Sequence, residues 1–168
     1  MDTLESFPPV VNHQTRILIL GSMPGRVSLS ETRYYAHPRN GFWHIMGRIC
    51  GAEFTLDYNR RLEILLANGI GLWDVIASCT RTTSLDTDIN DDSIITNDFR
   101  RLLTSHSSIA RIFFNGSKAE QTFKRYVSPS LTGMLDHIRL QRLISTSPAN
   151  ARYTLEEKIE IWRSHLCR

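Results

Sequence analysis

The sequence predicts an α/β fold: a three-layer α/β/α sandwich built on a central, mainly parallel four-stranded sheet. Strand-like apolar runs alternate with segments of helical periodicity, as in folds with helices on both faces of a parallel sheet. Residues 17–20, Ile-Leu-Ile-Leu, suit a strand buried on both faces. With 168 residues and 41% hydrophobic content, the chain can bury one sizeable core. We therefore expect one domain over residues 1–168.

The four expected strands occupy residues 17–20, 71–76, 111–114 and 139–144. Helical periodicity marks residues 41–50, 58–67 and 98–105, and the second of these helices should close at Asn68-Gly69 with a left-handed cap. Residues 78–92 read as a polar loop.

Two capping boxes predict the remaining helices. Ser117 with Glu120 and Thr154 with Glu157 match the pattern in which a hydroxyl and a carboxylate cap each other's backbone amides. They indicate helix starts near Lys118 and Leu155.

Charge and cysteine content narrow the partners and the compartment. Lys plus Arg number 20 against 17 Asp plus Glu, and all but three of these cations are arginine, whose fork binds two phosphate oxygens at once. Three distant cysteines, Cys50, Cys79 and Cys167, can build neither a disulfide framework nor a four-cysteine cluster. No signal peptide or membrane-length apolar run is evident. We expect a soluble cytoplasmic monomer with no membrane partner and a slight preference for phosphate.

Polar residues follow all four expected strands. Because the carboxyl ends of parallel strands share one edge of a sheet, these residues should meet on one rim. They are Gly21-Ser22-Met23-Pro24-Gly25, Asp74, Asn115-Gly116 and the run from Ser145 to Asn150.

An aromatic and cationic loop follows the first of these turns. Tyr34 and Tyr35 offer stacking surfaces, and Arg33 and Arg39 offer cations. Asn40 directly precedes an expected helix, so it is a candidate both for the helix cap and for chemistry. Packing at the core edge remains an alternative for the two tyrosines. The combination suits a flat, polar, anion-bearing ligand such as a nucleotide.

General nucleotide and metal motifs are missing. Neither a complete G-x-G-x-x-G nor a P-loop G-x-x-x-x-G-K-[ST] occurs. His37 and His44 lack the spacing and the acidic neighbours of a zinc site. We expect no metal and no cofactor.

The segments GSMPG, YYAHPRNGFW, GIGLWDVIASCTRTTSLD, FFNGSKA and STSPANA, in this order, resemble the uracil-DNA glycosylase superfamily, specifically its hypoxanthine-DNA (deoxyinosine) glycosylase branch. The resemblance extends from Ile17 to about Ala151. It implies an enzyme of base excision repair that flips a deaminated base out of double-stranded DNA and hydrolyses its N-glycosidic bond.

The resemblance also implies roles for individual residues. Asn40 would be catalytic, positioning water or the leaving group, and the Tyr35 ring would lie against the flipped base. Asp74 falls about where other branches carry an Asn that reads the pyrimidine edge. From this position we infer that Asp74 reads the N1–H of hypoxanthine, with a buried structural carboxylate as the alternative. The full base-binding set is Gly21, Ser22, Met23, Tyr35, Asp74 and Asn115. The DNA-binding set is Pro24, Gly25, Ser145, Thr146, Ser147, Pro148, Ala149, Asn150 and Arg152, in which Ser147 would grip phosphate and Ala149 or Asn150 would fill the vacated stack.

Two departures from related branches sharpen this expectation. Met23 stands where the mismatch-specific branch has Asn, and Ser145-Thr146-Ser147-Pro148 lacks the histidine that many branches use. These departures weaken the expectation of uracil excision and leave catalysis to Asn40. No lysine lies in the matched motifs, so we expect a monofunctional glycosylase without lyase activity.

Two other functions remain open at this point. A non-catalytic binder of nucleotides or damaged DNA would keep the fold and the aromatic loop, and a nucleoside hydrolase would act on free inosine. The sequence also leaves open the preferred base among hypoxanthine, uracil, xanthine and alkylated purines.

Overall fold

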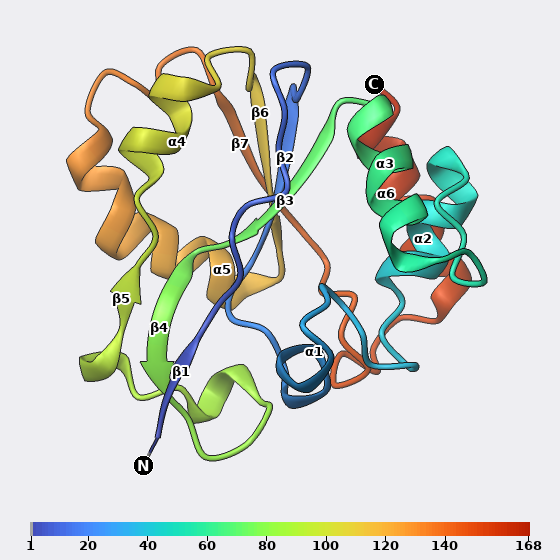
Figure 1. The fold of residues 1–168 in the computed structure, drawn as a ribbon, viewed down its shortest axis with the longest axis horizontal. Helices are drawn as coiled ribbons and strands as arrows, with labels where there is room; N and C mark the ends of the chain where they lie inside the picture. The colour runs from blue at the N-terminus through green and yellow to red at the C-terminus, as the bar shows by residue number, and fades with distance from the viewer. Residues whose placement is uncertain (1) are drawn as a thin grey trace.

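A four-stranded parallel sheet forms the middle layer of the computed structural model, which describes residues 2–168 (Figure 1). The strand order is β3-β2-β6-β7, and all three neighbouring pairs are parallel. The strands are β2 (Ile17–Gly21), β3 (Ile70–Asp74), β6 (Arg111–Asn115) and β7 (Arg139–Leu143). The predicted α/β sandwich with a parallel four-stranded sheet is confirmed.

Helices cover both faces of this sheet (Figure 1). One face carries α2 (Phe42–Cys50), α3 (Tyr58–Ala67) and α6 (Leu155–Leu166); the other carries α4 (Phe99–Ser105), α5 (Ser117–Thr122), a π-helical turn (Phe123–Val127) and a 3₁₀ turn (Ser128–Leu131). Alternation along β2 divides the core, since Leu18 and Leu20 pack toward α4 and Ile19 packs toward α2. None of the helices within residues 2–168 is long and apolar enough to cross a membrane.

A second, antiparallel sheet corrects the prediction for residues 71–92. The expected strand over residues 71–76 divides at Val75, and β4 (Ile76–Thr80) leaves to pair with β1 (Thr3–Glu5) and β5 (Ile95–Thr96). Only Ile76 and Cys79 of β4 are fully buried. The strand therefore needs few apolar residues, and its polar sequence resembles that of a loop. The rest of the expected loop holds 3₁₀ turns at Asp86–Asp88 and Asp91–Ser93.

The helix ends confirm two predictions and overturn a third. Helix α3 closes at Asn68 followed by Gly69 at φ 72°, and α6 begins with the complete Thr154–Glu157 capping box. The Ser117 capping box is wrong: Gly116 at φ 95° forms the N-cap, and Glu120 instead pairs with Lys124 and Arg142. A short helix, α1 (Arg26–Glu31), was not expected.

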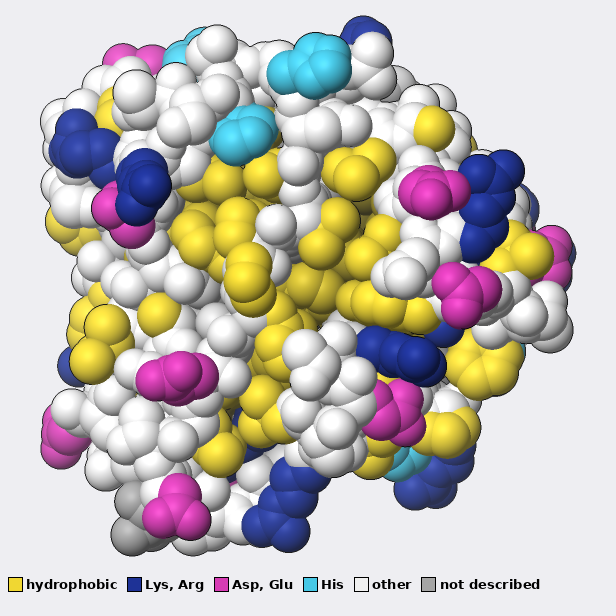
Figure 2. All heavy atoms as spheres, in the orientation of Figure 1, with side chains coloured by type: hydrophobic (Ala, Val, Ile, Leu, Met, Phe, Trp, Pro, Cys, Tyr) yellow, Lys and Arg dark blue, Asp and Glu magenta, His cyan; other side chains and the backbone are white. Residues whose placement is uncertain are grey.

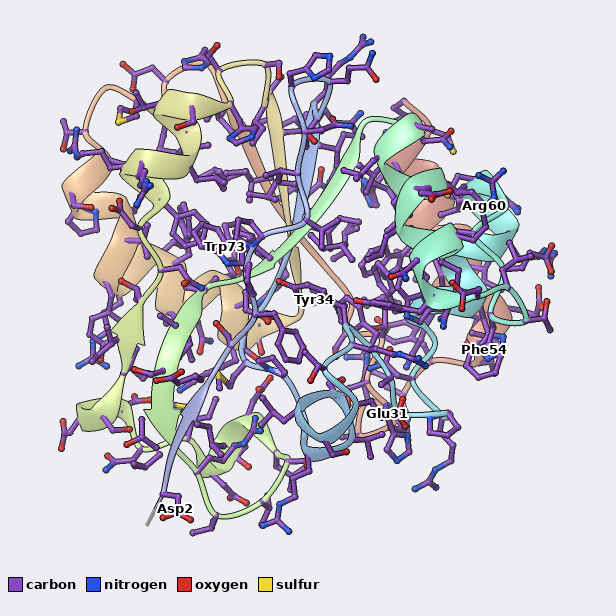
Figure 3. The ribbon with its side chains drawn as sticks, in the orientation of Figure 1. Asp2, Glu31, Tyr34, Phe54, Arg60 and Trp73 are labelled. Atoms are coloured by element: carbon purple, nitrogen blue, oxygen red, sulfur yellow. The ribbon has the colours of Figure 1, made fainter. Side chains whose placement is uncertain are left out.

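The N-terminal segment runs along the free edge of the sheet. Val10 pairs with Leu72 of β3, which covers backbone groups that would otherwise be an open edge. The indole of Trp73 donates to the Phe7 carbonyl at 3.1 Å, and the Tyr34 hydroxyl donates to the Pro8 carbonyl at 2.9 Å (Figure 3). On the face of the molecule drawn in Figure 2, hydrophobic side chains gather in the middle and charged side chains lie around the periphery.

Gly71 gives a test of this edge. A Cβ there would lie 2.8 Å from the Val10 carbonyl oxygen and 2.9 Å from Thr15 Cγ2. We expect Gly71→Ala to lower the free energy of unfolding by about 1–3 kcal/mol through overpacking. Gly25→Ala is the control, because its Cβ would meet nothing closer than 4.0 Å at an ordinary φ of −70°. Urea denaturation measures both variants, and equal stabilities would refute the close approach.

Candidate active site

The parallel register of β2 and β3 sets Asp74 against Gly21. These two residues are paired, and the ladder continues as Val75 N donates to the Gly21 carbonyl at 2.9 Å. A Cβ on residue 21 would lie 2.4 Å from Asp74 Oδ1 and 3.4 Å from the Tyr35 hydroxyl oxygen. Only glycine therefore lets the carboxylate and the phenol come together at the strand end.

Tyr34 anchors the aromatic loop in the core. It is 4% exposed and is fixed by three hydrogen bonds of 2.9 Å. Its amide donates to the Tyr58 hydroxyl, its own hydroxyl donates to the Pro8 carbonyl, and its carbonyl accepts from the Trp43 indole. Of the two tyrosines, Tyr34 is thus a packing residue, and it holds its neighbour in place.

Tyr35 adopts a strained backbone that turns its hydroxyl toward Gly21. Its φ is 54°, a left-handed conformation uncommon for a bulky residue. Its ring stacks on Phe42 with centroids 3.9 Å apart, so one face of the ring is covered by protein. Burial, and next the charge of Asp74, raise the pKa of Tyr35 although the nearby Asn115 amide opposes them. The phenol therefore stays protonated and available as a donor.

Two buried polar atoms at this point have no hydrogen-bond partner among the described residues. They are the Tyr35 hydroxyl oxygen and Asp74 Oδ2, and Asp74 is only 4% exposed. Burial, and next the charge of Asp86, raise the pKa of Asp74 to about 7 against the opposing effect of Arg81. Buried polar groups are nearly always satisfied in native proteins, so these two atoms beside Gly21 are candidate contacts for a ligand or an ordered water.

Arg81 and Asp86 support this site from the segment that was expected to be a plain polar loop. Asp86 Oδ1 accepts from the Ser22 hydroxyl at 2.6 Å, and Arg81 Nη2 donates to the Pro24 carbonyl at 2.6 Å. Arg81 is 5% exposed, and its positive charge interacts electrostatically with both Asp86 and Asp74. Sequence reasoning missed both residues, because the only signal was an arginine and an aspartate in a Thr/Ser-rich stretch.

The Gly21–Gly25 turn is held mainly through its backbone. Met23 is 6% exposed and its side chain packs with Ile76, Cys79 and Ile89 in a separate small core. Pro24 is buried, and Gly25 caps α1. Any contact of Met23 with a base must therefore come from its backbone.

Asn115 connects the ends of β6 and β7. Its Nδ2 donates to Thr146 Oγ1 at 2.9 Å, and its Oδ1 accepts from Thr146 N at 3.0 Å. The Thr146 carbonyl then accepts from Gly41 N at 2.9 Å. The amide of Asn115 is thus a turn-stabilising clamp, and it also places the start of α2 against the loop after β7.

Asn40 lies at the junction formed by this clamp. Its Oδ1 accepts from Phe42 N at 3.0 Å, a bond of the helix-cap type, while Gly41 is the N-cap residue by backbone position. Its Nδ2 makes no hydrogen bond within residues 2–168, and the residue is half-buried. The capping bond fixes the orientation of the amide and leaves its two N–H donors free.

The loop from Ser145 to Asn150 is folded on itself. Ser145 Oγ accepts from Ser147 N at 3.1 Å, and Ser147 Oγ accepts from Ala149 N at 3.2 Å. The side chain of Asn150 donates to the Ser145 carbonyl at 3.1 Å. Pro148 and Ala149 are exposed at the tip. Of the two residues expected to fill a vacated base stack, Asn150 is tied down and Ala149 is free.

Lys158 is a further residue that sequence reasoning missed. It is 5% exposed in the first turns of α6, and its Nζ donates to the Ser147 carbonyl at 3.2 Å. It lies on a helix outside the recognised motifs, so only the fold brings it under the loop. Arg152, by contrast, is exposed, with its guanidinium 5.5 Å from the Tyr153 ring centroid.

A chain of contacts joins six of the sixteen predicted site residues, with Gly41 as a further link. It runs from Asp74 and Gly21 to Tyr35, on to Asn115, and through Thr146 and Gly41 to Asn40. Arg152 and the Met23 side chain lie outside it. Residues 2–168 contain no group of three or more His, Cys, Asp or Glu side chains that could hold a metal ion.

Comparison with known proteins identifies the family of the chain. The family model described as the uracil DNA glycosylase superfamily matches residues 8–165. A hypoxanthine DNA glycosylase of Methanosarcina barkeri is 40% identical over 149 residues, covering 88% of this chain and 89% of that protein. A hypoxanthine DNA glycosylase of Methanosarcina acetivorans is 37% identical over 155 residues, covering 92% of each.

A solved structure is also similar. The solution NMR structure of a candidate uracil DNA glycosylase from Methanosarcina acetivorans superposes with a TM-score of 0.77 at 35% identity. The match covers 99% of this chain and 100% of that one.

The raised pKa of Asp74 predicts an unusual dependence of stability on pH. The folded-state pKa of about 7 lies above the ordinary value of 3.8, so the folded protein holds the proton more tightly. Stability should therefore fall as pH rises from about 4 to 7, by at most roughly 4 kcal/mol. Asp74→Asn, which does not titrate, should be more stable than the native protein at pH 8 and lose this advantage toward pH 4.

Urea denaturation at several pH values measures this difference. The exposed Asp136→Asn serves as the control and should track the native protein throughout. A constant difference between Asp74→Asn and the native protein across the pH range would show that the carboxyl group does not titrate near 7.

Proposed function

The chain belongs to the uracil DNA glycosylase superfamily, and from this premise we propose that it is a DNA glycosylase that releases hypoxanthine from deoxyinosine in DNA. The relatives named hypoxanthine DNA glycosylase share 37% and 40% of their residues with it over nearly their whole length. The enzyme acts as a monomer on double-stranded DNA at the chromosome, in the reducing cytoplasm.

One observation carries the choice against adenine: the orphaned pair of polar atoms beside Gly21. Guanine and uracil present the same acceptor and ring N–H as hypoxanthine, so the choice among these bases rests on the relatives. The Tyr35 hydroxyl is a donor, and Asp74 Oδ2 is an acceptor when ionised. Hypoxanthine presents the complementary pair on adjacent atoms, an O6 acceptor and an N1–H donor. Adenine presents an amino donor and a bare N1 acceptor in the same positions. The Tyr35 hydroxyl would then face a donor, and Asp74 Oδ2 would face an acceptor.

The site gives little reason for uracil to be preferred. The side chain of Met23 is packed in the core, so the glycine turn offers backbone but no amide or carboxylate to handle water. Among the predicted residues of the turn and the following loop, the Tyr35 hydroxyl is assigned to the base edge, and Asn40 is the one amide with free N–H donors. Catalysis therefore rests on Asn40.

Asn40 positions the attacking water. Its Oδ1 is anchored on Phe42 N, so its Nδ2 and the second lone pair of Oδ1 have a fixed direction. An amide is too weak a base to deprotonate water outright, which suits a reaction in which the glycosidic bond breaks first. The C1′–N9 bond breaks with its electron pair leaving on the base, the water oxygen joins C1′, and one water proton ends on the released base.

The negative charge that develops on the departing base needs stabilisation. The Tyr35 phenol remains protonated, and its rigid backbone directs the hydroxyl toward the base edge. A preorganised donor of this kind strengthens its hydrogen bond as charge builds up in the transition state. Capture of the flipped nucleotide would place Ala149, at the exposed tip of the loop, in the vacated stack.

The first test is base release from duplexes that each carry one lesion, followed by alkaline cleavage. Deoxyinosine duplexes should be cut and matched normal duplexes should not. Asn40→Ala should lower kcat about 100- to 1000-fold while binding of the duplex persists. Asn59→Ala, on the exposed face of α3, is the matched control and should be unaffected. Unchanged release by Asn40→Ala would make this chain a binder whose chemistry lies elsewhere.

The ionisation of Asp74 should appear in the pH profile of the reaction. An ionised carboxylate accepts the N1–H of hypoxanthine best, so kcat/KM for deoxyinosine duplexes should rise as pH rises through about 7. Asp74→Asn should flatten this limb. A limb that persists unchanged in Asp74→Asn would assign the titration to another group and remove Asp74 from base recognition.

A further inference from the structure

A cleft of about 370 Å³ opens directly beside the proposed catalytic residue. Its walls come from the turn that precedes α2, the loop after β7 and the start of α6. Arg39 and Gly41, the two neighbours of Asn40 in the chain, both line it. Any group bound there would lie next to the reacting sugar.

A buried lysine without an anion forms part of the cleft wall. Lys158 is 5% exposed, and within residues 2–168 it forms no ion pair with a carboxylate. Its one hydrogen bond, to the Ser147 carbonyl at 3.2 Å, uses one of three N–H donors. The carboxylates nearest in sequence, Glu156 and Glu157, are exposed and bond to Arg48 and Thr154 instead.

In the free protein the ammonium therefore has no carboxylate counter-charge among the described residues. Burial accordingly lowers the pKa of Lys158. An anion in the cleft would supply the missing charge and accept the unused donors.

Further groups on the cleft suit a phosphate. Arg39 is exposed on its rim, and its side chain forms no ion pair within the described residues. His44 also lines the cleft, and its ring stacks on Phe54 with ring centroids 5.0 Å apart. Asn150 and Thr146 add polar groups to a lining that also contains Pro38, Pro148 and Leu155. No carboxylate side chain contributes to it.

We propose that this cleft, with Lys158 at its wall and Arg39 at its rim, binds a backbone phosphate of the lesion strand next to the flipped nucleotide. The assignment rests on the proposed glycosylase function. Lys158 then acts as a positioning residue: it links the phosphate to the Ser147 carbonyl and so couples strand binding to the shape of the loop. A DNA phosphate fits better than a free one because the cleft lies between Asn40 and the loop tip at Pro148 and Ala149.

The test combines protein variants with phosphate neutralisation. The probe is a duplex carrying a stable tetrahydrofuran abasic site, with single methylphosphonates placed in turn at the phosphates around it. Lys158→Met should weaken binding of the unmodified duplex by about tenfold and reduce the slope of log Kd against log salt by about one. One methylphosphonate should weaken the native protein equally and have no further effect on Lys158→Met.

Lys124→Met is the matched control, because it removes the same charge from an exposed pair with Glu120 on the other face of the sheet. Arg39→Gln removes a rim cation without touching the loop, so it tests the cleft should Lys158→Met disturb folding. Arg39→Gln should show partial coupling to the same phosphate. The absence of coupling at every phosphate, with deoxyinosine release intact in the native enzyme, would overturn the subsite but not the proposed function.

Two other outcomes would also overturn it. If inorganic phosphate at matched ionic strength raises the Tm of the native protein but not of Lys158→Met, and methylphosphonates show no coupling, the cleft takes free phosphate. If borohydride traps Lys158 covalently on an abasic duplex, the amine is acting as a nucleophile and not as a phosphate ligand.

Discussion

The site depends on one constraint: a buried carboxylate is held beside a glycine by strand register. Asp74 faces Gly21 because β2 and β3 are parallel neighbours, and no side chain other than hydrogen fits between them. The carboxylate lacks a partner for Oδ2, so the fold tolerates a cost in its core. The charge of Arg81 offsets part of this cost, whereas the charge of Asp86 adds to it. Arg81 and the Ser22–Asp86 bond keep the glycine turn in place. Natural proteins retain such destabilising groups mainly where function needs them.

The site also requires that the residue for base recognition, Tyr35, and the residue for catalysis, Asn40, keep fixed positions relative to each other. Tyr35 belongs to the recognition side, while Asn40 precedes α2 and accepts a hydrogen bond from its first residue, Phe42. The Phe42 ring also stacks on Tyr35, so Phe42 contacts both residues. The Asn115–Thr146 clamp then ties that helix to the loop after β7 through the Gly41 amide. This explains why residues far apart in sequence form one continuous set of contacts.

Much of this arrangement was predictable from sequence, for identifiable reasons. Apolar runs and parallel topology were sufficient to place Gly21, Asp74, Asn115 and Ser145 at one edge of the sheet. The antiparallel sheet was missed because β4 buries only Ile76 and Cys79 of its five residues. The Ser117 cap failed because the backbone of Gly116, at φ 95°, already starts the helix. Local patterns report local structure well, but partners such as Arg81 and Asp86 are chosen by tertiary contacts.

Lys158 shows most clearly what a motif cannot contain. The absence of lysine from the matched segments supported a glycosylase without lyase activity, yet the fold brings a buried lysine under the Ser145–Asn150 loop. Proximity alone does not make it a nucleophile, since a Schiff base requires a neutral amine with a path to C1′. Its amine is instead bound to the Ser147 carbonyl and borders a cleft with no carboxylate side chain in its lining. In that setting a bound phosphate would favour the charged ammonium over the neutral amine, so phosphate binding and nucleophilic attack by this one group exclude each other.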